Sequence, residues 1–253
     1  SVAGYAGWPR PDHYYARNTW AGRQRAGDRW VLDSPINNAM AHFVMQTLFA
    51  AGATPEERAH PAHVAAELYR ARDIENLDTA CLRTRTREGV QVYFAGTHCC
   101  GTHVGPIVEF RGSEGVLRWS HQGGVQEKDG QALETFPNLE GATQRGAMIA
   151  AVLARIQGEP AFICDLELAK GQTIIINAAQ QSAPVHTIDP GHIERTESNG
   201  AHYTIVNGID ELMETAWREE KLFSEIGAPW TAEGGAMDVT DYTAFTGPKR
   251  TQT

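Results

Sequence analysis

Two polar residues, Asn38 and His42, stand four positions apart in an otherwise apolar stretch, DSPINNAMAHFVMQTLFAAG, that runs from position 33 to 52. On a helix, residues four apart lie on the same face. A polar group on a buried face needs a hydrogen-bonding partner. An imidazole can transfer protons near neutral pH, and a neighbouring amide can orient it. The pair therefore indicates either an acid/base site centred on His42 or a core histidine held by Asn38.

The stretch around these two residues carries signals for one continuous helix. Ser34 followed by Pro35 favours a helix start, because a hydroxyl can cap free backbone donors and proline presets the first helical φ. Gly52 favours a helix end. We therefore predict a helix over residues 33–52 with Asn38 and His42 on one face.

The segment before this helix, residues 8–30, combines prolines, aromatic residues and arginines (WPRPDHYYARNTWAGRQRAGDRW). Loops of this composition commonly carry binding sites, and a polar substrate needs several converging donors. The alternative is that the aromatic rings seal the edge of the core while the arginines face water. On the first interpretation, Arg10, Tyr15, Arg17 and Asn18 are candidates for binding a hydroxyl or a carboxylate.

The motif THCCGTH at 97–103 brings two histidines and two cysteines into one short stretch. On a strand, His98 and Cys100 point to one side and Cys99 to the other, so these side chains do not converge as zinc ligands must. We therefore expect no metal site. A metal protein built on His98, Cys99, Cys100 and His103 is a remote alternative, which metal analysis would decide. His98 could still line a pocket.

Composition excludes several classes of protein. The chain has 253 residues, 42% of them hydrophobic, and a net charge of −9 without a basic block, so a nucleic-acid surface is not expected. No apolar run approaches the roughly 20 residues of a membrane span, and the first residues do not resemble a signal peptide. Four cysteines without disulfide spacing predict free thiols and a cytoplasmic protein. The chain also lacks GxGxxG and GxxxxGK[ST] phosphate loops and a GxSxG nucleophile elbow.

The remaining pattern predicts strands followed mainly by helices. Strands are expected at 1–7, 64–71, 77–86 and 90–99, then a hairpin within 106–120 and a short strand pair before residue 137. Helices are expected at 141–158, 164–183 and 208–223, with a short strand at HYTIVN and an extended tail from about 224. Short connections between strands indicate an antiparallel or mixed sheet. We expect one α+β domain over residues 1–253.

Several motifs, in this order, resemble the C-terminal domain of the Gfo/Idh/MocA oxidoreductases. The entry motif is Asn38-Ala-Met-Ala-His42 followed by a helix that ends at Gly52. The others are VAAELYRA, LDTACLRTRTREGVQVYF, EFRGSEGVLRW, FICDLELAKGQTIIINAAQQSA and LFSEIGAPW. The resemblance covers nearly the whole chain. It departs from the family in two respects, because the N-terminal Rossmann domain is missing and Asn38 stands where the family usually has Asp.

The resemblance implies a large, mainly antiparallel, open-faced sheet with helices packed on one face, similar to the C-terminal domain of glyceraldehyde-3-phosphate dehydrogenase. It implies the substrate-binding half of an NAD(P)-dependent oxidoreductase acting on a sugar, polyol or related hydroxyl compound. NAD or NADP would bind the intact protein, and neither is expected on this chain alone. A homodimer or tetramer through the sheet face is expected, since a bare apolar face is too large for a monomer.

The resemblance places His42 on the family's catalytic histidine, with Asn38 beside it, where an amide can orient the imidazole but not stabilise its cation as a carboxylate would. Asp33 is an alternative source of a carboxylate. The expected substrate-binding residues are Arg10, Tyr15, Arg17, Asn18, Asp33, Asn37 and His98. The alternative function is a non-enzymatic ligand-binding or oligomerisation module.

Overall fold

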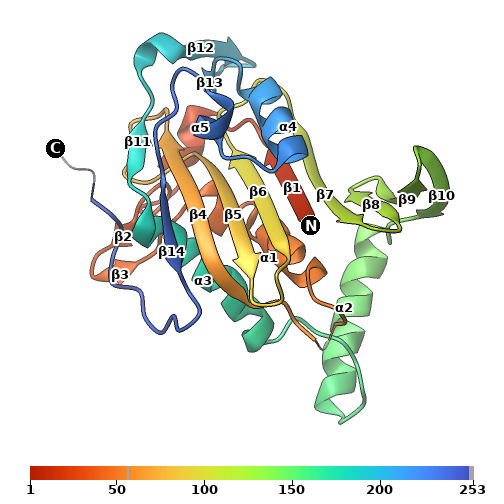
Figure 1. Cartoon of the computed structure of the whole chain (residues 1–253). Coiled ribbons are helices and arrows are strands. Elements are labelled where there is room, and N and C mark those ends of the chain that lie inside the picture. The colour runs from red at the N-terminus through yellow and green to blue at the C-terminus, as the bar shows by residue number, and fades with distance from the viewer. Residues whose placement is uncertain (56, 251–253) are drawn as a thin grey trace.

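The computed structural model describes residues 1–55 and 57–250, so the last three residues of the expected tail lie outside the described part. Its centre is a ten-stranded sheet in the order β10-β9-β8-β7-β1-β6-β5-β4-β11, with β14 also paired to β4 (Figure 1). The pairs β1–β6 and β4–β11 are parallel, and the other pairs are antiparallel. The strands of this sheet are β1 (Val2–Gly7), β4 (Pro61–Arg70), β5 (Thr79–Thr86), β6 (Gln91–Thr97), β7 (Val104–Gly112), β8 (Gly115–Ser120), β9 (Gly123–Lys128), β10 (Gln131–Phe136), β11 (Val185–Thr187) and β14 (Gly235–Asp238).

The helices and the smaller strand pairs lie outside this sheet. The α-helices are α1 (Ala41–Ala50), α2 (Gly141–Ile156), α3 (Leu166–Ser182), α4 (Ile209–Glu219) and α5 (Phe223–Ile226). Short 3₁₀ helices occur at η1 (Asp12–Ala16), η2 (Pro35–Asn37) and η3 (Pro190–His192), and two hairpins are β2 (Arg25–Ala26) with β3 (Arg29–Trp30), and β12 (Ile193–Ser198) with β13 (Ala201–Val206). None of the helices in the described ranges is long and apolar enough to cross a membrane.

The predicted fold class, α+β with a large, mainly antiparallel sheet, is confirmed. Helices α1 and α3 pack on one face of the sheet through a core that includes Met40, Leu48 and Ile175 (Figure 1). Two glycines let α1 and the residue before it, Met40, approach the sheet closely. A Cβ on Gly4 would lie 2.9 Å from Thr47 Cγ2, and one on Gly96 would lie 2.9 Å from Met40 Sδ.

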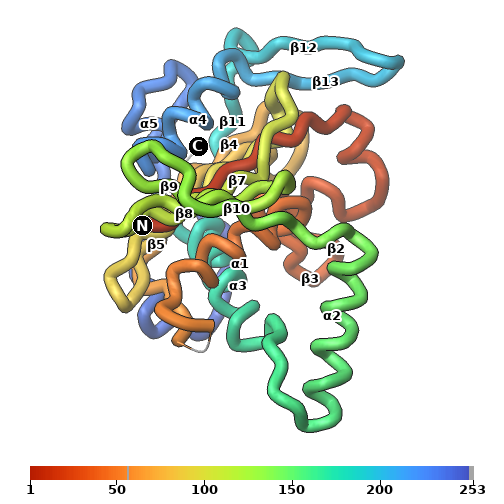
Figure 2. The backbone as a smooth tube through the Cα atoms, turned by 90° about the vertical axis from the view of Figure 1, so that its right-hand side faces the viewer, coloured from red at the N-terminus to blue at the C-terminus, as the bar shows by residue number. Residues whose placement is uncertain are grey.

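The structure adds a cover on the opposite face, formed by α4, α5 and the segment after them (Figures 1 and 2). Trp217, Phe223 and Trp230 pack there against Tyr5 and Tyr69. The sequence predicted an extended tail from about residue 224. The structure instead forms helix α5 at the start of this region and strand β14 within it. Over β1 and β4–β6 the chain therefore buries its own sheet face, and these strands do not need a partner subunit for that purpose.

Polar contacts fix this cover to the sheet. The Trp217 indole N–H donates to the carbonyl of Ala3 at 3.1 Å. The buried Glu67 carboxylate accepts hydrogen bonds from the backbone N–H and the hydroxyl of Ser224 at the start of α5. A buried carboxylate is tolerated only when it is hydrogen-bonded, so Glu67 and α5 depend on each other.

Helix α2 behaves differently, because it projects from the body (Figure 2) and its apolar side chains are exposed. Only Ala151 and Ala154 of this helix are partly covered. Its exposed apolar side chains are Met148, Ile149, Val152, Leu153 and Ile156. Helix α2 therefore makes few side-chain contacts with the rest of the described chain.

The predicted helix over 33–52 is wrong at its start. Only residues 35–37 form a 3₁₀ turn, and Asn38 then leaves helical geometry with φ −137° and ψ −89°. The Ser34 hydroxyl caps nothing and is buried without a partner, so the α-helix begins at Ala41. Asn38 and His42 therefore do not share a helix face.

We predict that the C-terminal cover contributes to the stability of the fold and that the apolar face of α2 does not. Phe223 is 0% exposed, so Phe223→Ala should lower the free energy of unfolding by about 3–5 kcal/mol. Ile149 is 55% exposed, so Ile149→Ala should change it by less than about 0.5 kcal/mol. Urea denaturation of both variants measures the difference, and equal losses would contradict this assignment of the core.

Candidate functional site

The parallel pairing of β1 with β6 creates one end of the sheet at which two chain segments leave together. Gly7 and Thr97 are register partners at the ends of these strands. Beyond them, the Trp8 N–H donates to the Thr97 carbonyl at 3.0 Å and the Arg10 N–H donates to the His98 carbonyl at 3.2 Å. The carboxyl ends of parallel strands are where open sheets commonly bind ligands.

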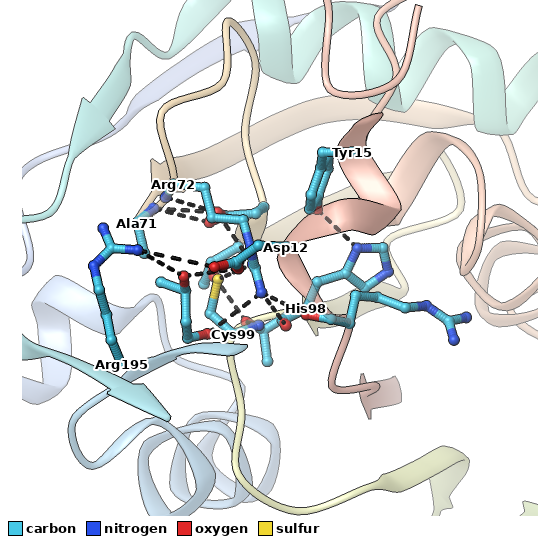
Figure 3. Close-up of polar contacts among 12 residues, drawn as sticks. Asp12, Tyr15, Ala71, Arg72, His98, Cys99 and Arg195 are labelled. Carbon is cyan, nitrogen blue, oxygen red and sulfur yellow. Dashed lines mark hydrogen bonds and ion pairs between the residues drawn. The ribbon is translucent and has the colours of Figure 1, made fainter. Parts of the chain in front are cut away.

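His98 forms a buried pair with Tyr15, and Figure 3 shows the Tyr15 hydroxyl directed at the imidazole. Tyr15 Oη lies 2.9 Å from His98 Nδ1. Burial, then the charges of Arg10, Arg72 and Arg17, lower the pKa of His98 well below its usual value, so the ring is neutral at pH 7. Burial raises the pKa of Tyr15, which keeps its proton. No other acceptor for the hydroxyl occurs among the described residues, so Tyr15 donates to Nδ1 and the ring proton of His98 is on Nε2.

Arg72 joins the loop after β1 to the sheet. Its Nε donates to Asp12 Oδ1 at 2.8 Å, and its Nη1 donates to Cys99 Sγ at 2.9 Å (Figure 3). Its Nη2 donates to the Arg10 carbonyl at 2.7 Å, and the Asp78 carboxylate lies 3.5 Å from Nη1. Because every nitrogen of this guanidinium already has a partner, Arg72 positions the loop and has little capacity left for a ligand.

Asp33 is the partner of Asn38. Asn38 Nδ2 donates to Asp33 Oδ1 at 2.7 Å, and the Gly22 N–H donates to Asp33 Oδ2 at 2.7 Å. Arg17 Nη2 lies 3.9 Å from the same carboxylate. The Asp33 side chain is buried, with 5% of its surface exposed. The Asn38 amide is therefore bound to Asp33. Because Asn38 and His42 do not share a helix face, this amide does not orient the His42 ring in the way that the sequence predicted.

Two other predicted substrate-binding residues stabilise their own loops. Asn37 Nδ2 donates to the Leu32 carbonyl at 3.2 Å. Asn18 Oδ1 accepts from the backbone N–H groups of Trp20 and Ala21 at 3.0 and 2.7 Å. Such side-chain-to-backbone bonds hold turns in place. Asn37 Nδ2 and Asn18 Oδ1 are thus engaged within the protein.

His42 is exposed in the first turn of α1, beside an aromatic cluster. Its ring centroid lies 6.5 Å from that of Phe43, which contacts Trp8 edge-on at 5.8 Å. His103 stacks on Trp8, and Trp119 packs on the other side of Phe43. We define the aromatic cluster as Trp8, Phe43, His103, Trp119 and His121. Sequence reasoning missed it, although Trp8 directly follows a predicted strand.

Arg10 connects the polar residues to this aromatic cluster. Its guanidinium carbon lies 5.7 Å from the Trp8 ring centroid and 5.2 Å from that of Tyr14. The guanidinium carbon of Arg17 lies 3.7 Å from the Tyr14 ring centroid. One connected set of contacts thus includes Arg10, Tyr15, Arg17, Asp33, Asn38 and His98. His42 is linked to this set by its ring contact with Phe43, which in turn contacts Trp8.

A cavity of about 830 Å³ is lined by Tyr15 together with residues of the loops after β1 and β4. Its wall is mainly charged, with Arg23, Arg70, Arg72 and Arg195 interleaved with three carboxylates. Arg70 and Arg72 are bound to protein groups, and Arg195 lies against Asp12 and Thr204. Ligand pockets are usually apolar with a few free polar groups, so this cavity is a weaker candidate than the aromatic cluster.

The side chains of the THCCGTH motif lie apart. His98 binds Tyr15, Cys99 accepts from Arg72, and His103 stacks on Trp8. Burial raises the pKa of Cys100 to about 12, which disfavours the thiolate that a metal requires. In the ranges that the structure describes, no three His, Cys, Asp or Glu side chains are placed to hold a metal ion.

We predict that Asn38→Asp destabilises the fold, because it replaces a hydrogen-bond donor to Asp33 by a second carboxylate. The loss at pH 7 should be at least about 2 kcal/mol. One carboxyl of the pair should then bind a proton more tightly in the folded state, so the loss should shrink as the pH falls. Urea denaturation across pH measures this, with Asn199→Asp in the exposed β12–β13 turn as the control. A loss that did not depend on pH would contradict the Asp33 contact.

We predict that His98 stays neutral well below its usual titration range. Because its folded-state pKa is lowered, the unfolded chain binds the extra proton, and this group lowers stability as the pH falls below about 6.5. Its C2 proton should therefore keep one NMR chemical shift from about pH 8 to about pH 5.5. A His98 midpoint near 6.5 would show that the ring is not buried with Tyr15.

No protein-family model matches this sequence, and no curated protein matches it. Solved structures match it by fold. One is the WlbA dehydrogenase from Bordetella pertussis in complex with NADH and UDP-GlcNAcA, at 19% identity and a TM-score of 0.50. Another is the UDP-N-acetylglucosamine 3-dehydrogenase GnnA from Acidithiobacillus ferrooxidans, at 13% identity and a TM-score of 0.51.

Both matches cover 69% of this chain and 50% of the other chain, so the chain spans about half the length of the solved structures that it matches. Both solved structures are oxidoreductases of the Gfo/Idh/MocA type. At these identities the likeness concerns the fold. This chain has the fold of the C-terminal domain of Gfo/Idh/MocA-type oxidoreductases, as its sequence motifs implied.

Proposed function

We propose that this chain, as one structural unit, is the substrate-binding half of an NAD(P)-dependent oxidoreductase that acts on a sugar, polyol or related hydroxyl compound. The observation that carries the proposal is His42, an exposed imidazole beside the aromatic cluster at the end of β1 and β6. The fold supports it, because one structure of similar fold was solved with NADH and UDP-GlcNAcA and another is a UDP-N-acetylglucosamine 3-dehydrogenase.

In this proposal His42 is the general base that removes the proton of the substrate hydroxyl during oxidation, and returns it during reduction. An exposed ring with no hydrogen-bonding partner among the described residues is free to approach a substrate. Trp8, Phe43 and Trp119 are partly exposed aromatic side chains against which a sugar ring can lie. Asp33 and Asn38 hold the turn that leads into α1 and so position His42 indirectly.

The dinucleotide must be held elsewhere. This sequence has no glycine-rich phosphate loop, and none of the described residues is assigned to NAD or NADP. A bound nicotinamide would supply the hydride acceptor, and the chain's own contribution is confined to binding the substrate and transferring its proton.

The proposed substrate-binding residues differ in whether their polar groups have hydrogen-bonding partners within the protein. No hydrogen bond or ion pair joins the Arg10 side chain or His98 Nε2 to another described residue, although Arg10 lies over two aromatic rings. Hydrogen bonds within the protein engage the Tyr15 hydroxyl, the Asp33 carboxylate, Asn18 Oδ1 and Asn37 Nδ2. Arg17 donates to the Tyr14 carbonyl. We propose Arg10 and His98 as direct contacts and the others as positioning residues.

A homo-oligomer is also proposed for the complete protein, although α4 and α5 already cover part of the sheet face on which that expectation was based. The apolar surface that is still exposed includes α2 and the edge strand β10. Light scattering coupled to size-exclusion chromatography determines the state, and a strict monomer would end this part of the proposal.

The second candidate function is a non-enzymatic ligand-binding or assembly module, favoured by Asn38, whose amide binds Asp33 and not His42. A panel of sugars and polyols, assayed with NAD⁺ and NADP⁺ on the protein joined to its nucleotide-binding domain, separates the two. Turnover of any panel member supports the oxidoreductase, whereas saturable binding without turnover supports the module.

We predict that His42→Ala lowers kcat in such a complete protein by about 10²–10⁴-fold, the usual loss for a general acid or base. Because His42 is exposed, the midpoint of urea unfolding should stay within error of the parent. His202→Ala, an exposed histidine on the β12–β13 hairpin, is the matched control and should retain full kcat. Near-normal turnover in His42→Ala would remove His42 from the chemistry.

A further inference from the structure

The Arg10 guanidinium is fixed in place but unpaired. Its backbone is held on both sides, by donation to the His98 carbonyl and by acceptance from Arg72. Its side chain lies between the Trp8 and Tyr14 rings, yet makes no hydrogen bond or ion pair with any described residue. Its Nε is buried without a partner. A buried donor left unsatisfied costs about 1–3 kcal/mol, so an acceptor is expected at this point.

His98 presents a second unsatisfied donor next to the same tyrosine. The residue is 2% exposed, and its ring centroid lies 5.4 Å from that of Tyr14. Since Nδ1 accepts from Tyr15, the ring proton is on Nε2, which is buried and has no partner. Two donors therefore flank Tyr14, and both lack the acceptor that burial requires.

Two neighbouring arginines differ from Arg10, because each lies near a carboxylate. Arg72 contacts the carboxylates of Asp12 and Asp78, and Arg17 lies 3.9 Å from that of Asp33. Arg10 has no carboxylate within 4.0 Å among the described residues, in a chain whose net charge is −9. Arg72 and Arg17 thus lie near carboxylates, whereas Arg10 is available to bind a ligand.

We propose that Arg10 and His98 bind a carboxylate carried by the substrate, so that the substrate class is a sugar acid. The inference rests on the proposed function for its sugar framework and adds the group by which the sugar is held. A carboxylate matches because it is planar and singly charged, with two oxygens for the guanidinium fork and the imidazole N–H. The sugar ring would then lie over Trp8 toward Phe43 and His42.

Isothermal titration calorimetry of this chain alone tests the proposal with three probes: sodium D-glucuronate, D-glucose and D-glucose 6-phosphate. We expect glucuronate to bind at least about tenfold more tightly than glucose, the usual gain from a charge-assisted hydrogen bond. Arg10→Gln should remove that advantage and leave the affinity for glucose unchanged. Arg10→Lys, which keeps the charge without the fork, should restore part of it.

Two further variants control for position and folding. Arg23→Gln removes an exposed arginine of the charged cavity and should leave glucuronate binding unchanged. His98→Asn keeps a group for the Tyr15 hydroxyl but withdraws the Nε2 donor, and should weaken glucuronate several-fold. Far-ultraviolet circular dichroism and the urea midpoint verify that each variant is folded before its affinity is compared.

Any one of four results would overturn the proposal. The first is no binding of glucuronate at tens of millimolar, the second is equal affinity for glucuronate and glucose, and the third is tighter binding of glucose 6-phosphate. An equal effect of Arg10→Gln and Arg23→Gln would also remove the site from Arg10. Because no cofactor or turnover is involved, these outcomes are independent of whether the complete protein proves to be an oxidoreductase.

Discussion

The parallel pairing of β1 with β6 is the constraint on which the candidate site depends. Because these neighbours run in the same direction, the segments that follow Gly7 and Thr97 emerge at one end of the sheet and hydrogen-bond to each other. Two glycines in the same strands let α1 lie close to them. An antiparallel arrangement would send these two segments to opposite ends and separate Arg10 from His98.

The polar groups of the site differ in whether they have hydrogen-bonding or ion-pair partners within the protein. Most charged side chains in this region have partners: Arg72 holds the loop to the sheet, and Asp33 binds Asn38 and the loop backbone. Such contacts make the loop rigid, which lowers the entropy lost when a ligand binds. What stays free is the exposed ring of His42, the guanidinium of Arg10 and one nitrogen of His98. The chemistry we propose is confined to these three groups.

Local signals were sufficient for most elements, and failures occurred where a distant contact decided the geometry. Strand alternation and glycine turns predicted β5, β6 and the β7–β8 hairpin because these patterns need only neighbours in the chain. The helix start at Ser34 was wrong because Asn38 turns toward the Asp33 carboxylate instead of continuing the helix. Trp119 and His103 were missed because only folding of β7 and β8 beside α1 brings them to Phe43 and Trp8. The period of α4 predicted a helix but could not say which face of the sheet it covers.

The central claim is that a sugar binds at the end of β1 and β6 and not in the charged cavity that Tyr15 lines. A crystal structure of this chain soaked with a sugar acid tests it most directly. The account predicts ligand density against Trp8, with a carboxylate at Arg10 and a hydroxyl facing His42. Density between Arg23 and Arg195 in the cavity, with Arg10 and His98 unbound, would contradict it.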